Sequence, residues 1–525
     1  MTDIPSSTSS TQTNRYHRFV VIVGAGASGI VQAGELLRSK TLPHEEFVLL
    51  DRYPEFGGCW WKNTYPGCAC DTPTHVYQVS WWKNPNWSRS FAPQKEILEY
   101  YKGLAEHLEL RKNTHFNTEV TSAEWFEEEM LWHVHTRDVT TGEKALWTCN
   151  MFITATGPFH TPKYLDVPGI SDFQGQQWHA MEWPSQIDLT NKRVAVIGTG
   201  PSAVQIVSEI SKEQGIELDV YQRSPGHCLP KEDGPFKEIT KWTFRNVPGV
   251  MDAYALLQYL MLTIVVYRAC KLNSWISKIV NGIAEGLVKK LVKDPEKQKK
   301  LVSLDSFGCK RPLLSDDFYR ALDRSNVNLI TSSVTSITKT GINSKNPSTD
   351  ETEFREVDII IWATGYHMTP CPIPTTGRNG ADLLQQYGPK VYCLYGLAIS
   401  AFPNYGNFIG PHQVSFWTPI LLLIELCARY HTQVIKKLLE LNAGSYKRAV
   451  VPRREREVEW VESLREAQNK LPLGVDSCKS YYKTEDGVVI MWPWATGALV
   501  KLLDKVNWRD YTVLETRVGE GVSEK

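Results

Sequence analysis

Two segments of this chain share one pattern, in which a short apolar run leads through a glycine-rich turn into a stretch with helical spacing of apolar residues. The first segment is Phe19–Leu37, with its turn at residues 24–29. The second is Arg193–Lys212, with its turn at residues 198–203. An apolar run followed by glycines and a helix predicts a strand–turn–helix unit of a parallel sheet. The chain is therefore predicted to be an α/β protein that contains two such units.

The first glycine turn has the spacing of a dinucleotide-binding fingerprint. Gly24 permits the tight turn, Gly26 lets a pyrophosphate approach the backbone, and Gly29 lets the helix pack closely on the strand. The next apolar run, Phe47–Leu50, ends in Asp51, where a second strand would place a carboxylate on ribose hydroxyl groups. A glycine turn by itself is weak evidence, but the carboxylate at this spacing predicts a Rossmann-like, dinucleotide-binding unit.

The second unit differs from the first at the end of its second strand. The run Leu218–Tyr221 is followed by Gln222 and Arg223 instead of an acidic residue. A carboxylate there would repel a phosphate, whereas an arginine pairs with the 2′-phosphate of NADPH, so the sequence predicts NADPH over NADH. A solvent-exposed Arg223 without a ligand is the alternative. The predicted contacts of this nucleotide are Gly198, Thr199, Gly200, Pro201, Ser202, Ala203, Gln222, Arg223 and Ser224.

Residues 226–304 change to helical spacing with lysine-rich ends and are predicted to be a helical insertion. Within them, the apolar stretch Ala253–Val266 is bracketed by Asp252 and Arg268, which makes it shorter than the ~20 residues that cross a bilayer. No transmembrane segment is therefore predicted. A helical insertion in the NADPH-binding unit is favoured, and peripheral membrane contact is the alternative.

Composition narrows the function classes. The chain has 525 residues and 42% hydrophobic content, enough for two or three domains with substantial cores. Its 58 basic residues balance 58 acidic ones, which favours small-molecule chemistry and no nucleic acid partner. Residues 1–15 are predicted to be a disordered tail and not a secretory leader, so an intracellular, cytoplasmic protein is expected. The 11 cysteines lack zinc-type pairs, so free thiols and no metal site are expected.

Two longer motifs lie between and beside these units: GGCWWKNTYPGCACD at Gly57–Asp71 and FQGQQWHAMEWP at Phe173–Pro184. The second fits the pattern FxGxxxHxxxWP and the first fits GGxWxxxxYPGxxxD at every fixed position. Together with two dinucleotide fingerprints, they resemble the flavin-dependent Baeyer-Villiger monooxygenases. The stretch CACDTPTHVY, which begins at Cys68, is similar to the members that act in fungal secondary metabolism.

The resemblance implies FAD in the first unit and NADPH in the second. It implies a reaction in which a C4a-peroxyflavin inserts one oxygen atom of O2 next to a ketone carbonyl, giving an ester or lactone. It also implies an order of domains, in which strands ending in Ala-Thr-Gly close each nucleotide unit. The expected divisions are an FAD domain at 16–158 and 367–525, an NADP domain at 159–225 and 305–366 with a linker motif at 173–184, and the helical insertion at 226–304.

The resemblance also implies roles for individual residues. Arg311, in the segment Ser306–Pro312, is expected to be the catalytic cation, Asp71 to orient it, and Lys310 to meet the phosphate of NADPH. His179 belongs to the linker motif and is expected to couple the domains instead of acting as a base. The expected FAD contacts are Gly24, Gly26, Ala27, Ser28, Gly29, Asp51, Arg52, Gly58, Cys59, Trp60, Cys70, Asp71, Tyr77 and Val120, with Tyr65 as a further wall of the flavin pocket.

The chain departs from the family pattern at Thr64 and Ala69, where many relatives carry arginine, which puts cofactor placement and substrate access in doubt. An N- or S-hydroxylating flavin monooxygenase is the alternative enzyme, although its linker usually lacks the Trp183-Pro184 ending. A disulfide reductase would need a CxxxxC pair after the first fingerprint, and the sequence has none there. The non-enzymatic alternative is an FAD-binding redox scaffold. It predicts loss of the Arg311 and Asp71 pair, which is present.

Overall fold

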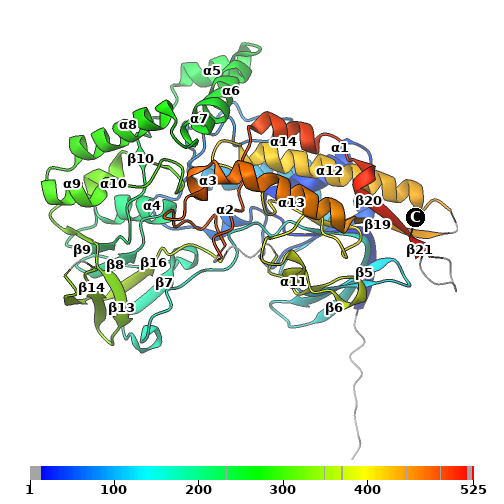
Figure 1. Cartoon of the computed structure of the whole chain (residues 1–525), viewed down its shortest axis with the longest axis horizontal. Helices are drawn as coiled ribbons and strands as arrows, with labels where there is room; N and C mark the ends of the chain where they lie inside the picture. Colours follow the sequence, from blue (N-terminus) through cyan, green and yellow to red (C-terminus); the bar gives the residue numbers. More distant parts are fainter. Residues whose placement is uncertain are drawn as a thin grey trace, which may run out of the picture.

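Two β-sheets flanked by helices organise the chain in this computed structural model (Figure 1). The structure describes residues 14–231, 233–347, 349–367, 371–444, 446–484, 486–516 and 523–524. The predicted α/β class with two Rossmann-like units is confirmed, because each sheet is built on parallel strands joined through helices.

The first sheet has the strand order β17-β4-β5-β6-β1-β2-β3, with β18 also paired to β6. The strands β1, β2, β3, β6 and β18 run parallel, and β4 and β5 form antiparallel pairs beside them. Their bounds are β1 Asn14–Val23, β2 Phe47–Leu50, β3 Thr114–His115, β4 Thr118–Phe126, β5 Leu131–Asp138, β6 Lys144–Thr154, β17 Thr375–Thr376 and β18 Tyr405–Asn407.

Helices from distant parts of the chain cover this sheet. Helix α1 (Ala27–Arg38) follows the first glycine turn and packs on α12 (Ile420–Leu441) and α3 (Gln94–His107). Their apolar faces share one core with the strands, in which Ile22, Leu36 and Leu426 are almost fully buried. A C-terminal segment therefore completes the first nucleotide unit.

The start of β1 corrects one prediction. Asn14 and Arg15 pair with Ala145 and Leu146 of β6, so the expected disordered tail ends before residue 14. These first strand residues have exposed polar side chains and carry no apolar pattern, and main-chain pairing alone extends the strand. The rest of that predicted tail, residues 1–13, lies outside the described residues.

The second sheet is parallel, with the strand order β12-β9-β8-β16-β7. Its bounds are β7 Gln176–His179, β8 Arg193–Ile197, β9 Glu217–Tyr221, β12 Val327–Ile330 and β16 Ile359–Trp362. Helices α4 (Pro201–Ile210) and α10 (Asp317–Leu322) pack beside it, and β13 (Ser333–Ile337), β14 (Gly341–Lys345) and β15 (Thr352–Glu356) form a separate antiparallel sheet. The edge strand β7 comes from the FxGxxxHxxxWP motif.

The insertion between these sheet segments is helical, as the sequence predicts, and it projects from the top of the molecule in Figure 1. Its elements are β10 Cys228–Leu229, α5 Glu238–Asn246, α6 Val250–Leu260, the π-helical turn η5 Met261–Val266, α7 Tyr267–Ala269, α8 Trp275–Leu291 and α9 Pro295–Leu301; β10 pairs with β11 at Leu313–Leu314.

The length predicted for the apolar part of the insertion is wrong. The helix is continuous over 20 residues, Val250–Ala269, and is long and apolar enough to cross a membrane by length and composition. It extends past Asp252 and Arg268 because neither charged residue ends a helix when its side chain can reach solvent.

Helix α2 (Cys59–Lys62) belongs to the first long motif. The remaining elements lie in the C-terminal part and are α11 Leu383–Tyr387, α13 Arg454–Asn469, α14 Thr496–Leu503, β19 Lys447–Pro452, β20 Tyr511–Thr516 and β21 Ser523–Glu524. Strands β19, β20 and β21 form an antiparallel sheet at the end of α12.

The cysteines bring a second correction. Cys309 and Cys478 form a disulfide with Cα atoms 5.7 Å apart, although 169 residues separate them in the sequence. The prediction of free thiols is therefore wrong for this pair, because spacing along the chain says nothing of contacts made by folding. In the described part of the chain the other nine cysteines are free, including Cys68 and Cys70.

Candidate active site

The first glycine turn forms a tight cradle at the end of β1. Gly24 has φ +117°, and a Cβ added to it would lie 2.4 Å from the carbonyl oxygen of Ala155. A Cβ on Gly29 would lie 1.9 Å from the carbonyl oxygen of Gly24. Helix α1 starts after Gly26 without a side-chain cap, so its first amide groups face the turn unpaired by side chains. This is the arrangement that binds a pyrophosphate.

Asp51 is held against this turn. One carboxylate oxygen accepts a hydrogen bond from the Ala25 amide at 2.6 Å, and the other accepts one from the Tyr53 amide at 2.8 Å. Burial raises the pKa of Asp51, while these two hydrogen bonds act in the opposite direction. The neighbouring Arg52 is exposed and donates to the Tyr53 hydroxyl and to the His160 carbonyl.

The motif Gly57–Asp71 begins directly on the glycine turn. The Gly57 amide donates to the Ala25 carbonyl at 3.1 Å. A Cβ on Gly58, which has φ +55°, would lie 2.9 Å from the Cα of Gly26, and a Cβ on Gly26 would lie 3.3 Å from the Cα of Gly58, so the two backbones are closely packed. The structure thus brings Gly58 and the start of α2, with Cys59 and Trp60, next to the predicted pyrophosphate cradle.

The middle of the same motif rests on α4, the helix of the second unit. The Tyr65 hydroxyl donates to the Gln205 side chain at 3.0 Å and accepts from Ser202 at 3.2 Å. Gln205 in turn donates to the Ala69 carbonyl at 2.9 Å, and a Cβ on Gly67 would lie 2.9 Å from the Gln205 carbonyl oxygen. The sequence predicts Tyr65 to be a wall of the flavin pocket. The structure buries its side chain against α4. One continuous motif contacts both nucleotide units.

The motif ends at Asp71, which meets Arg311. The Arg311 Nε and Nη2 atoms donate to the two carboxylate oxygens of Asp71 at 2.9 and 2.7 Å, a bidentate pair. The Asp71 carboxylate raises the pKa of Arg311 well above its ordinary value, so the guanidinium is a permanent cation. The two side chains remain 31% and 27% exposed, so the pair faces open space on one side.

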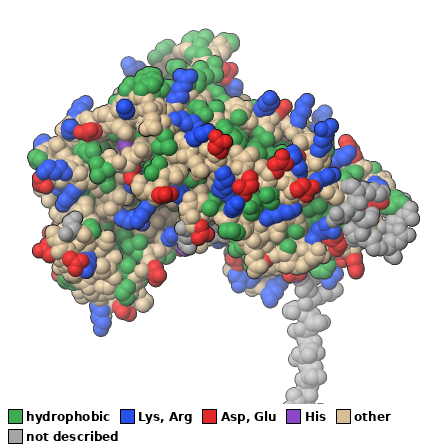
Figure 2. All heavy atoms as spheres, in the orientation of Figure 1, with side chains coloured by type: hydrophobic (Ala, Val, Ile, Leu, Met, Phe, Trp, Pro, Cys, Tyr) green, Lys and Arg blue, Asp and Glu red, His purple; other side chains and the backbone are tan. Residues whose placement is uncertain are grey.

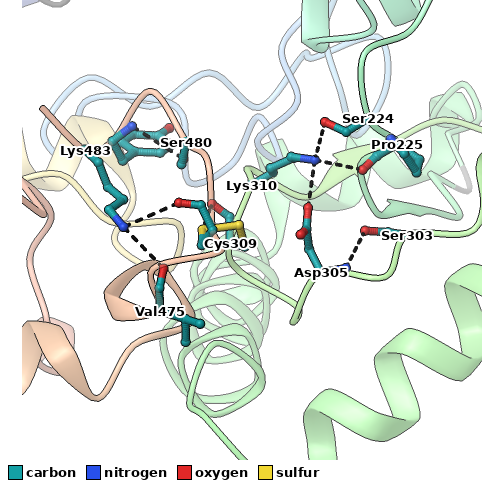
Figure 3. The surroundings of a disulfide bond; sticks show 11 residues. Ser224, Pro225, Ser303, Asp305, Cys309, Lys310, Val475, Ser480 and Lys483 are labelled. Carbon is teal, nitrogen blue, oxygen red and sulfur yellow. Dashed lines mark hydrogen bonds and ion pairs between the residues drawn. A yellow bond between two sulfur atoms is a disulfide. The ribbon is translucent and has the colours of Figure 1, made fainter. Parts of the chain in front are cut away.

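Lys310 points to the other side, toward the second unit, as Figure 3 shows. Its ammonium group donates to the Ser224 hydroxyl at 2.8 Å and to the Pro225 carbonyl at 3.2 Å, and it pairs with Asp305 at 2.7 Å. Lys310 and Ser224, which the sequence predicts to hold the same nucleotide, are therefore in contact. Asp305 is an unexpected partner that compensates the lysine charge.

The second glycine turn has the same form as the first. Gly198 has φ +112°, and a Cβ on it would lie 2.5 Å from the Ala363 carbonyl oxygen. A Cβ on Gly200 would meet nothing within 4 Å, so the space in front of the turn is open. Helix α4 starts at Pro201 without a side-chain cap, followed by Ser202 and the buried Ala203. These unpaired helix amides suit a phosphate group.

The residues after β9 divide into two environments. Gln222 is buried and donates from its side chain to the Lys300 carbonyl of the insertion, so it does not face the open turn. Arg223 is exposed, and among the described residues no hydrogen bond or ion pair holds its guanidinium. Arg223 is thus available to a phosphate on this edge, whereas Gln222 acts as a link to the insertion.

The other predicted flavin contacts lie around the first cradle. Trp60 donates from its indole nitrogen to the Tyr77 hydroxyl at 2.8 Å, and the two rings meet edge to face. Cys70 is buried, and burial raises the pKa of its thiol. Val120 packs in the core of the first sheet with Val23 and Leu50.

His179 of the linker motif binds the backbone where the chain leaves the second sheet. Its Nε2 atom lies 2.9 Å from the Gly365 carbonyl oxygen, and its Nδ1 atom accepts from the Met181 amide at 3.2 Å. Burial lowers the pKa of His179, so the ring is neutral. Both ring nitrogens are occupied, which supports a structural role and leaves no nitrogen for a base.

Sequence reasoning missed a disulfide and a tyrosine pair that lie near Arg311. The Cys309–Cys478 disulfide joins the segment before Lys310 and Arg311 to the C-terminal loop (Figure 3). The same loop carries Tyr481 and Tyr482, whose hydroxyl groups hydrogen-bond to each other near the guanidinium of Arg311. The position of Cys309 two residues before the expected catalytic arginine was the one signal in the sequence.

Comparisons with known proteins agree with this arrangement. A family model described as flavin-binding monooxygenase-like matches residues 18–218. The FAD-binding monooxygenase BOA2 of Botryotinia fuckeliana is 44% identical over 507 residues, which is 96% of this chain and 96% of that protein. A Baeyer-Villiger monooxygenase of Pseudomonas aeruginosa is 34% identical over 515 residues, which is 95% of this chain and 92% of that protein.

Solved structures share the fold. The crystal structure of OTEMO in complex with FAD and NADP superimposes with a TM-score of 0.81 at 24% identity, covering 94% of this chain and 99% of that one. The closed crystal structure of cyclohexanone monooxygenase gives a TM-score of 0.81 at 22% identity, covering 96% and 99%. From the paired motifs, the two nucleotide units and the similarity over almost its whole length, the chain belongs to the family of FAD- and NADPH-dependent Baeyer-Villiger monooxygenases.

Proposed function

We propose that this monooxygenase inserts one atom of O2 next to the carbonyl group of a ketone and releases an ester or lactone, with Arg311 as the catalytic cation and Asp71 as its positioning residue. One observation carries the proposal: the bidentate Arg311–Asp71 pair stands at the end of the motif that contacts both nucleotide units. The pair therefore fixes a cation where one motif joins the two nucleotide units.

The two cradles fit the two cofactors. The glycine turns leave no room for side chains on the strand side and present unpaired helix amides on the open side, which suits the pyrophosphate of a dinucleotide. When bound, FAD that has been reduced by NADPH activates O2 and supplies the transferred oxygen atom. The residues proposed to hold FAD are Gly24, Gly26, Ala27, Ser28, Gly29, Asp51, Gly58, Cys59, Trp60 and Tyr77. Those proposed to hold NADPH are Gly198, Thr199, Gly200, Pro201, Ser202, Arg223, Ser224 and Lys310.

Arg311 acts as a fixed hydrogen-bond donor. Attack on a ketone places negative charge on the carbonyl oxygen, and a guanidinium stabilises that charge by about 3–4 kcal/mol for a well-placed donor. Two of its five N–H groups are bound to Asp71, and among the described residues its Nη1 atom donates to no protein atom. Because the pKa of Arg311 is raised, it holds its proton throughout and does not act as a general acid.

Asp71 sets the direction of that donor. A bidentate carboxylate fixes the plane of the guanidinium, which an exposed arginine side chain would otherwise sample through several rotamers. The cost of leaving a carboxylate partly buried is offset by the same pair. Asp71 therefore contributes by positioning, while the charge that meets the substrate belongs to Arg311.

We also propose the domain division, with 16–158 and 367–525 around FAD, 159–225 and 305–366 around NADPH, and 226–304 as the insertion. The segments that cross between the sheets support it. Pro162 forms a bridge with Tyr366, and the Lys163 amide donates to the Gly365 carbonyl at 2.9 Å. His179 hydrogen-bonds to the same carbonyl. The crossing segments at residues 162–163 and 365–366 would therefore move together with the linker motif when the units reorient.

The substrate class is tested by product analysis. Purified holoenzyme is supplied with NADPH, isotopically labelled O2 and a panel of ketones, sulfides and amines, including bulky polycyclic ketones of the kind found in fungal secondary metabolism. The proposal expects esters or lactones that contain one labelled oxygen atom. Formation of sulfoxides or N-oxides without any ester would establish the hydroxylating alternative instead.

The protein is also proposed to be intracellular and cytoplasmic. Its expected need for NADPH supports this location.

A further inference from the structure

The helical insertion carries a large exposed apolar surface that the fold does not use. We call it the apolar cap, and Figure 2 shows its green side chains at the top of the molecule. Its members are each at least 37% exposed: Ile239, Trp242 and Val247 on or after α5; Leu256, Leu257, Leu260, Met261, Ile264 and Val265 on α6 and η5; and Trp275, Ile279 and Ile283 on α8. Scattered exposed apolar residues are ordinary, but this many on successive helices of one insertion marks an interaction surface.

The cap is one face of a helix whose other face is occupied. Its members on α6 and η5 follow helical spacing along one side, whereas Tyr254 and Tyr267 lie on the other. The Tyr254 ring packs edge to face on His75, and the Tyr267 ring packs on Trp417. Asp252 pairs with Lys83 of the first unit at 2.6 Å. These contacts hold both ends of the helix against the protein body, which fits a helix that lies on a bilayer better than one that crosses it.

Basic residues flank the members of the cap along the chain. Residues 237–290 contain eight Lys and Arg against three Asp and Glu, while the whole chain is balanced at 58 of each. Among the described residues, exposed basic side chains of this region that form no ion pair are Lys237, Arg245, Arg268, Lys278 and Lys290. An apolar face bordered by free cations fits a surface that is apolar inside and anionic outside.

We propose that the apolar cap docks this enzyme on the surface of an anionic lipid bilayer, with α5, α6 and α8 lying in the headgroup region. Trp242 and Trp275, at 51% and 69% exposed, stand where indole rings favour the membrane interface. A second copy of this chain fits the cap less well, because two positively bordered faces would repel each other. The bilayer satisfies both the apolar and the charged part of the surface.

The cap is connected to the active-site segment. A Cβ on Gly308 would lie 2.9 Å from the Sγ atom of Cys270, at the end of the cap's central helix, and Gly308 stands three residues before Arg311. Phe307 and Cys309 share a core with Ala269 and Cys270. Resting on the proposed function, docking would place the site close to apolar ketones dissolved in the bilayer.

Vesicle co-sedimentation tests the docking without any substrate. Holoenzyme is mixed with vesicles of phosphatidylcholine or with an equimolar mixture of phosphatidylcholine and phosphatidylserine. We expect binding to the mixed vesicles that weakens at high salt, and at most weak binding to phosphatidylcholine alone. Leu257→Glu and Trp275→Glu should each weaken binding by about tenfold or more, because each replaces a side chain that would enter lipid with a charge. Lys278→Glu should weaken binding to the mixed vesicles and leave binding to phosphatidylcholine unchanged.

The matched control is Leu384→Glu, which changes a leucine that is 51% exposed on α11, away from the cap. It should bind vesicles as the parent does. The proposal is overturned if the parent does not sediment, or if the cap variants bind as well as the control. It is also overturned if light scattering shows a dimer that the same cap variants dissociate. If the parent enzyme binds vesicles but forms no ester from any ketone, the proposed function is contradicted and the docking proposal stands.

Discussion

Replacing Arg311 with alanine should separate oxygen transfer from folding and cofactor binding. The guanidinium is partly exposed and makes its two protein hydrogen bonds only to Asp71, so the fold should lose about 1–3 kcal/mol of stability. Ester formation should fall by about 10²–10³-fold, the loss that follows removal of one donor to a developing oxyanion. NADPH consumption should continue, and its electrons should appear as hydrogen peroxide.

The assay measures NADPH oxidation, hydrogen peroxide and ester on the same sample, so that the ratio of ester to NADPH gives the coupling. Asp71→Asn is the informative partner, because it keeps the side-chain size and removes the charge that orients Arg311. It should lower the coupling less than Arg311→Ala does, by about tenfold. Arg320→Ala removes an exposed arginine on α10 that forms no ion pair among the described residues, and it should leave the coupling unchanged.

Undiminished ester formation by Arg311→Ala would refute the reasoning, whatever the stability of the variant. Equal losses in Arg311→Ala and Arg311→Lys would support the need for the bidentate pair, because lysine keeps the charge and lacks the planar fork. Recovery of most activity in Arg311→Lys would instead show that charge alone is sufficient and that Asp71 has little positioning role.

Four further outcomes follow from the structure. Gly26→Leu should abolish FAD retention, measured by the flavin absorbance of the purified protein, because its side chain would fill the cradle beside Gly58; a yellow variant would contradict the assignment. Arg223→Ala should raise the KM for NADPH and leave that for NADH unchanged. Titration in denaturant should find nine thiols without reductant and 11 with it, owing to the Cys309–Cys478 disulfide. Burial lowers the pKa of His412 to about 4 from 6.5, so the unfolded state alone takes up its proton between these values. The free energy of unfolding, measured in denaturant at a series of pH values, should therefore fall as pH drops from 6.5 towards 4, and His412→Gln should reduce that slope by up to about 1.4 kcal/mol per pH unit.

The parallel units were predictable because each one carries its signal within a few residues. The runs Phe47–Leu50 and Arg193–Ile197 are strands with the predicted bounds, since an apolar run that stops at a glycine or an acid leaves little freedom in where the strand ends. Strand pairing between segments that are distant in the sequence leaves no local pattern from which it could be predicted. The strand β18 adds to β6 across about 250 residues, and the helix Val250–Ala269 continues through charged residues that only the folded neighbours explain.

The site shows the same division between local and distant information. The family resemblance pointed to Arg311, Asp71 and Lys310, and the structure pairs Arg311 with Asp71, as expected, and Lys310 with Ser224. Spacing could not show which way a side chain turns. Gln222 follows β9 as a cofactor ligand would, yet it binds a carbonyl of the insertion, because a buried amide must find a partner wherever the fold offers one.

The motif Gly57–Asp71 explains why two departures from the family pattern leave the site intact. Its fixed positions are those that touch other segments: Gly58 lies against the first glycine turn, Tyr65 bonds to α4, and Asp71 bonds to Arg311. Thr64 is exposed, and Ala69 contributes its backbone carbonyl to α4, which any residue could supply. An arginine at either position is not needed to join the units. The contacts that connect the two nucleotide units with Arg311 are therefore made by residues that this chain retains.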